Sequence, residues 1–62
     1  MKIEIISEKH ITVSELSSAV SILAFSRYPL TVRLDSGGIN AEKECDGFDE
    51  AKNFLSELLA ER

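Results

Sequence analysis

Two segments of alternating polar and apolar residues flank a pair of glycines, and this arrangement constrains the fold more than any other feature. Residues 30–34 carry Leu, Val and Leu at every second position, and residues 39–45 alternate in a similar way. A period of two is typical of a strand with one buried face. The glycines of residues 35–38 supply the positive φ angles that tight turns need. The pattern predicts a β-hairpin in which Arg33 opposes Glu42 or Glu44.

The N-terminal part of the chain predicts one strand followed by one helix. Isoleucines alternate with charged residues over positions 2–5, which indicates a half-buried strand. Thr12 and Glu15 have the spacing of a capping box, so a helix is expected to begin there. Its end is expected at Tyr28, because Pro29 disfavours helical geometry in the residue before it. The apolar stripe of this helix consists of Val13, Leu16, Ala19, Val20 and Leu23.

A second helix is expected near the C-terminus, with Asp49 or alternatively Asp46 as its N-cap. Its apolar stripe consists of Ala51, Phe54, Leu55, Leu58 and Leu59. The fold class is therefore α+β: a two-layer β-α-β-β-α sandwich in which two helices cover one face of a small, mainly antiparallel three-stranded sheet. Residues 1–62 are expected to form a single domain without an internal repeat. The uncovered face carries Lys2, Glu4, Thr31, Arg33, Asn40, Glu42 and Glu44.

Composition limits the function classes. The net charge is −4 and the seven basic residues are scattered, so no nucleic-acid partner is expected. No apolar run reaches the length of about 18 residues that spans a membrane, and the N-terminus does not read as a signal peptide. Cys45 is the only cysteine, which fits a cytoplasmic location, and with one histidine it makes a poor metal site. No cofactor is expected, whereas self-association to a homodimer would compensate for a small core.

His10 is the first candidate for chemistry. It precedes the expected helix start by two residues, and free N–H groups and the dipole at such an end stabilise an anion. A phosphoryl group carried on the imidazole is one interpretation, with Thr12 helping to hold the phosphate; an exposed loop histidine without a role is the other. Nucleophile, base and oxyanion site in a cleft are not evident, so an enzyme is not expected.

A serine-rich face of the first helix is the second candidate. Small side chains allow close approach of another surface, and an aromatic residue among them can act as an anchor. The alternative is an ordinary solvated face. The candidate interface residues are Ser14, Ser18, Ser21, Ile22 and Phe25.

The hairpin of residues 30–43 and the segment Asp-Gly-Phe-Asp-Glu-Ala that leads into the leucine-rich stripe resemble a known family. They are similar to the histidine-containing phosphocarrier protein HPr of the bacterial sugar phosphotransferase system and its non-carrier relatives. The resemblance implies an HPr-like α/β fold and phosphotransferase-system proteins as partners. The family motif H-x-R-P is absent, since Ile11, Thr12 and Val13 follow His10. Ungapped alignment from Tyr28 instead places Ser14 at the acceptor position.

The family also has a short helix and a fourth strand between the hairpin and the last helix, and this chain has neither. Loss of that strand implies re-pairing within the sheet or pairing with another chain. The sequence therefore favours a small, non-enzymatic, degenerate HPr-like protein that acts through protein–protein contacts. The alternatives are a homodimeric structural or interaction protein unrelated to the phosphotransferase system, and a phosphocarrier that uses His10.

Overall fold

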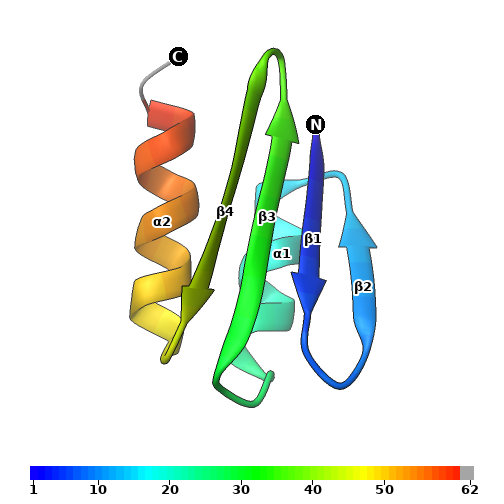
Figure 1. The fold of residues 1–62 in the computed structure, drawn as a ribbon, viewed down its shortest axis with the longest axis vertical. Helices are drawn as coiled ribbons and strands as arrows, with labels where there is room; N and C mark the ends of the chain where they lie inside the picture. Colours follow the sequence, from blue (N-terminus) through cyan, green and yellow to red (C-terminus); the bar gives the residue numbers. More distant parts are fainter. Residues whose placement is uncertain (61–62) are drawn as a thin grey trace.

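In the computed structural model, which describes residues 1–60, two β-hairpins are each followed by a helix (Figure 1). The elements are β1 (Lys2–Ile6), β2 (His10–Val13), α1 (Leu16–Ala24), β3 (Leu30–Ser36), β4 (Ile39–Cys45) and α2 (Phe48–Ala60). The strands form one antiparallel sheet in the order β2-β1-β3-β4. Both helices lie on the same side of the sheet, where α1 packs against β1 and β2 and α2 packs against β4. The predicted two-layer α+β sandwich is confirmed.

The sheet has four strands rather than the predicted three, because residues 10–13 form β2. This strand pairs with β1 in a register that runs from Ile3 opposite Val13 to Ile6 opposite His10. Three β-branched residues in succession favour the extended conformation, and pairing with β1 satisfies backbone groups that a helix start would leave open. The topology thus repeats a strand–strand–helix unit that the sequence does not reveal.

The predicted capping box at Thr12 is wrong. The first helix begins at Leu16, and Glu15 is its N-cap in extended geometry without a side-chain capping hydrogen bond. The helix ends at Ala24, before the Tyr28 end point expected from the sequence. Of the predicted stripe, Ala19 and Leu23 are fully buried, so the inward face of the helix was assigned correctly.

The predicted hairpin of β3 and β4 is confirmed. Ser36 pairs with Ile39, and the two glycines between them adopt φ angles of 51° and 92°. Arg33 lies opposite Glu42 and donates a hydrogen bond from Nη2 to Glu42 Oε2 at 3.0 Å. Glu42 is therefore the partner, and Glu44 lies opposite Thr31 instead.

The centre of the sheet is the antiparallel pairing of β1 with β3. Ile3 lies opposite Leu34 and Ile5 opposite Val32, and all four side chains have no exposed surface. The HPr resemblance implied that the loss of a strand requires re-pairing within the sheet or pairing with another chain. In the structure the chain pairs with itself, because β1 lies directly beside β3. The remaining fully or nearly fully buried apolar residues are Ala19, Leu23, Leu30, Cys45, Ala51 and Leu55.

The second helix begins at Phe48, so neither Asp49 nor Asp46 is an N-cap that precedes it directly. Asp49 lies within the first turn, where its charge is favourable near the positive end of the helix dipole. The Glu50 carboxylate accepts a hydrogen bond from the Asp46 backbone N–H at 3.0 Å and so closes this end of the helix. None of the helices within residues 1–60 has the length and apolar character needed to cross a membrane.

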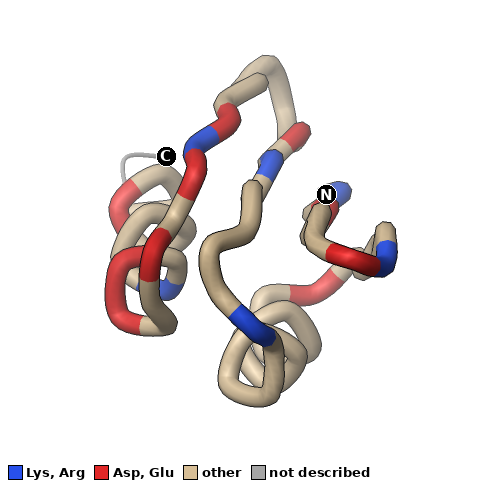
Figure 2. Tube along the Cα trace, turned by 60° about the horizontal axis from the view of Figure 1, so that its bottom comes forward, with Lys and Arg blue, Asp and Glu red and all other residues tan. Residues whose placement is uncertain are grey.

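Negative charge gathers on one side of the molecule. Six of the eleven Asp and Glu residues lie in the segment 42–57. Figure 2 shows these positions over β4 and α2, where acidic positions outnumber basic ones, whereas acidic and basic positions are balanced over the rest of the described trace.

Cys45 provides a test of the packing between β4 and α2. Burial first, and then the nearby Glu50 carboxylate, raise the pKa of its thiol above the ordinary value. Because the thiolate is the reactive species, we expect alkylation by iodoacetamide at pH 8 to be about tenfold or more slower in the native protein than in urea. The measurement is intact mass against time. Equal rates in both conditions would contradict the burial of Cys45.

Candidate functional site

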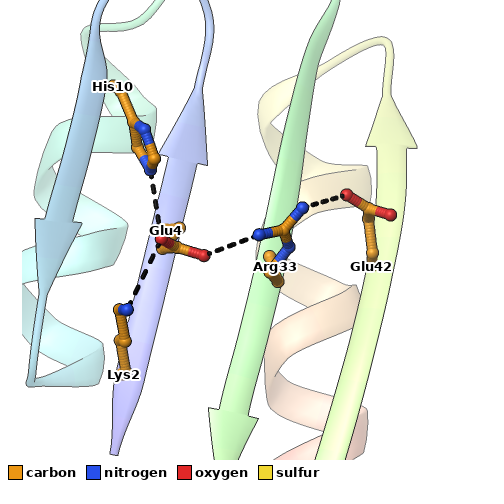
Figure 3. Close-up of polar contacts among 5 residues, drawn as sticks. All are labelled: Lys2, Glu4, His10, Arg33 and Glu42. Atoms are coloured by element: carbon orange, nitrogen blue, oxygen red, sulfur yellow. Dashed lines mark hydrogen bonds and ion pairs between the residues drawn. The ribbon is translucent and has the colours of Figure 1, made fainter.

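His10, the predicted phosphoryl acceptor, lies on the sheet and not beside a helix end. It is the first residue of β2, and its side chain extends over the face of the sheet that no helix covers (Figure 3). Its Nε2 atom lies 3.2 Å from Glu4 Oε1. The predicted position of His10 next to the helix N-terminus is therefore wrong, because β2 and the residues 14–15 separate it from α1.

Thr12 and Ser14, the other predicted phosphate residues, differ in their position relative to His10. Thr12 lies two residues after His10 on the same face of β2 and is opposite Glu4 in the β1–β2 register, whereas Ser14 lies between β2 and α1. Thr12 and Ser14 line a small depression near the N-terminus, to which Ser18 also contributes. His10 does not line this depression.

Glu4 is the centre of a polar network on the open face of the sheet (Figure 3). Its Oε2 atom accepts a hydrogen bond from Arg33 Nη1 at 3.2 Å, and Lys2 Nζ lies 3.7 Å from Oε1. Arg33 uses its second nitrogen for Glu42, so the network crosses β2, β1, β3 and β4. Only 9% of Glu4 is exposed, because its neighbours cover it.

Electrostatics keep the Glu4 carboxylate ionised. Desolvation by burial alone would raise its pKa, but Lys2, the hydrogen bond with His10 and the Arg33 guanidinium together hold the pKa below its ordinary value of 4.5. Lys2, Glu4, Arg33 and Glu42 therefore each lie beside an opposite charge, which favours a role in holding the strands in register. Within residues 1–60, no three His, Cys, Asp or Glu side chains are placed to hold a metal ion.

A second feature is an open groove at the end of the molecule where α1 terminates, here called the α1-end groove. The turn between β1 and β2 lines one part of it, the end of α1 with the loop that leads to β3 lines another, and the start of β3 and the end of β4 also contribute. Apolar residues that line it are Ile6, Ile11, Ile22, Phe25, Tyr28, Pro29 and Leu30. Charged residues that line it are Glu8, Lys9, Arg27 and Glu44. An apolar groove with a charged rim is the usual anatomy of a binding surface.

Phe25 is the most unusual residue of this groove. It is 90% exposed, whereas every other large apolar side chain within residues 2–60 is at least half-buried. Phe25 is the C-cap of α1, and its backbone N–H donates to the carbonyl of Ile22. Phe25 adjoins other apolar residues of the groove, and a contiguous exposed apolar patch is a candidate surface for an interaction.

Two hydroxyl groups fix the end of α1 and thereby hold Phe25 outside the core. Ser26 Oγ donates to the Ile22 carbonyl at 2.6 Å, and Tyr28 Oη donates to the Leu23 carbonyl at 2.8 Å. Each bond adds a second donor to a carbonyl of the last turn, since Ile22 and Leu23 already accept from the backbone N–H groups of Phe25 and Ser26. Because the loop is tied back in this way, Phe25 does not fold over the helix end.

The predicted interface residues of α1 separate into two groups. Ser21, Ile22 and Phe25 line the α1-end groove, whereas Ser14 and Ser18 line the depression at the opposite end of the helix. The structure adds the β1–β2 turn to the lining of the groove. Sequence reasoning missed that part because it treated residues 7–11 as a loop that leads into a helix.

No family model, curated protein or solved structure matches this chain. The HPr resemblance therefore rests on the residues of the β3–β4 hairpin and of the segment that leads into α2.

The lowered pKa of Glu4 leads to a pH-dependent prediction. A carboxyl group whose pKa is lower in the folded protein stabilises the fold above its unfolded pKa, and this stabilisation is lost as the pH falls through the folded value. We expect Glu4→Gln to lower the urea midpoint at pH 7 and the difference from the wild type to shrink below pH 4.5. Glu57→Gln, an exposed position on α2, is the matched control for charge. A difference that stays constant from pH 7 to pH 3 would contradict this role.

Proposed function

We propose that this chain is a small non-enzymatic protein of the HPr-like type that acts by binding a protein through the α1-end groove. The observation that carries the proposal is Phe25, which is 90% exposed beside apolar groove residues from three segments of the chain. A side chain of this size contributes a large apolar contact area when a partner covers it.

The polar residues of the open sheet face support the same proposal, because they already interact with one another within the fold. Lys2, Glu4, His10 and Arg33 bind one another across the strands. Their hydrogen-bonding and ionic capacity is used within the fold, so the sheet face offers less to a ligand than the groove. The cytoplasmic location and a phosphotransferase-system partner belong to this proposal through the resemblance of the β3–β4 hairpin.

Site-specific photocrosslinking tests the proposal. A benzoylphenylalanine replaces Phe25 in one variant and Glu57 in the matched control, and both are expressed in the cells that naturally make the protein. We expect a protein crosslinked at position 25 and not at position 57. The crosslinked protein is then purified, and its affinity for the wild type is compared with that for Phe25→Ser.

We expect Phe25→Ser to weaken this binding about tenfold or more, because buried aromatic anchors carry a large share of interface energy. Circular dichroism should show an unchanged fold, since the side chain is exposed in the free protein. Equal crosslinking from both positions, or an affinity that Phe25→Ser leaves unchanged, would contradict the proposal.

A non-carrier function also predicts no phosphoryl transfer to His10. A phosphoryl group on Nε2 would meet the Glu4 carboxylate, which lies 3.2 Å from this atom and would repel it. After incubation with phosphoenolpyruvate, enzyme I and HPr, intact-mass measurement should show phosphate on HPr and none on this protein. A mass increase of one phosphoryl group that His10→Ala abolishes would instead establish the phosphocarrier function.

A further inference from the structure

We infer that the α1-end groove binds a second copy of this chain, so that two molecules associate about a two-fold axis with each Phe25 placed in the groove of the other. This inference rests on the proposed function, and it names a second copy of the chain, in place of a phosphotransferase-system protein, as the partner that occupies the groove. It follows from the charges around the groove, from the apolar anchor and from the state of the sheet edges.

The two basic side chains of residues 1–60 that form no ion pair or ring contact within the fold lie at this groove. Among the Lys and Arg residues of positions 1–60, Lys2, Arg33 and Lys43 form ion pairs, and Lys52 lies over the Phe48 ring. The two that remain in this part of the chain are Lys9 and Arg27, and both line the groove. An unpaired cation beside exposed apolar surface favours contact with a group of opposite charge.

The same groove carries the opposite charge in equal number. Glu8 and Glu44 also line it, and within residues 1–60 neither forms an ion pair. A rim with two cations and two anions carries both kinds of charge, which a two-fold interface built from one surface patch needs if opposite charges are to meet across it. A strongly acidic or strongly basic partner would leave two of these four charges facing a like charge.

The apolar part of the groove supplies the anchor. Phe25 lies at the rim of a groove lined by Ile11, Ile22 and Tyr28, and two-fold symmetry allows each copy to donate one Phe25 and to receive another. The groove involves fifteen residues. A contact of about 800 Å² per molecule, typical of specific complexes, would cover about a fifth of the 3950 Å² surface.

The edges of the sheet are less suited to self-association than the groove. The long edge strand β4 carries Glu42, Lys43 and Glu44 in succession, and antiparallel pairing centred on Glu42 or Lys43 would bring like charges together. The other edge strand, β2, has only four residues. Charges and short length are the usual means by which sheet edges avoid pairing with another chain.

Sedimentation equilibrium of the purified protein is the first test. We expect a monomer–dimer equilibrium for the wild type, a dissociation constant about tenfold or more higher for Phe25→Ser, and no change for Glu57→Ser. A wild type that stays monomeric at about 1 mM, where even very weak association is detected, would overturn the inference. A dimer that Phe25→Ser leaves intact would overturn it as well. If the wild type is monomeric while position 25 crosslinks to a different protein, the inference fails and the proposed function stands.

Charge reversal gives a second test that does not depend on the loss of an apolar side chain. Arg27→Glu leaves one cation and three anions on the rim, and Glu44→Lys leaves three cations and one anion. We expect each variant alone to dimerise about fivefold more weakly, and an equimolar mixture of the two to recover association as a heterodimer. Glu57→Lys makes the same charge change as Glu44→Lys outside the groove, so it should dimerise as the wild type does, and its heterodimer with Arg27→Glu should be weaker than the heterodimer of Arg27→Glu with Glu44→Lys. A heterodimer with Glu57→Lys as tight as that with Glu44→Lys, or no recovery with Glu44→Lys, would overturn the inference.

Discussion

The pairing of β1 with β3 is the interaction on which the rest of the structure depends. The other strand pairs are hairpins between neighbouring segments, which form locally, whereas β1 and β3 are separated by β2, α1 and the loop that follows. Ile3, Ile5, Val32 and Leu34 meet at this pairing and are fully buried, so apolar burial offsets the entropy of closing the long loop. Once these strands pair, the two second strands become the sheet edges, and both helices cover the apolar face.

The same register determines the chemistry of the uncovered face. Glu4 lies opposite Arg33, and Arg33 lies opposite Glu42, because the polar residues alternate with the buried ones. His10 joins this row because β2 pairs beside Glu4. A histidine that looked in sequence like part of an anion site is therefore part of a cross-strand ion network, which helps to hold together a sheet with only one layer of helices.

The features that could be predicted are those in which local preference and tertiary packing agree. The hairpin around the two glycines follows from a period of two and a turn that needs positive φ angles, and the apolar stripes of both helices follow from helical spacing. At residues 10–15 the local sequence preference and the tertiary packing disagree. Thr12 and Glu15 have capping-box spacing, yet the β-branched run from Ile11 to Val13 pairs with β1, and this long-range pairing is invisible to local patterns.

The candidate site, too, could be predicted only in part from the sequence. Helical spacing placed Ser21, Ile22 and Phe25 on one face of the first helix, and the structure confirms that Phe25 is exposed there. The groove itself requires the β1–β2 turn, which lines it only through the strand that sequence patterns missed. Lys9 and Arg27 are far apart in sequence, so their common position on one rim could not be read from the chain.

Phe25 is exposed because α1 is short and ends at Ala24, directly before this residue. Nine residues of α1 suffice to cover β1 and β2, and the Ser26 and Tyr28 hydroxyls close the helix end at once. Burial of a phenylalanine is worth about 1.5–3 kcal/mol, a substantial gain for a small domain, and the fold leaves it unused. Residues 26–30 instead carry the chain directly into β3, where Leu30 is buried. The free energy that folding does not gain at Phe25 therefore remains available to the association that we propose, and the charges of the surrounding rim would give that association its specificity.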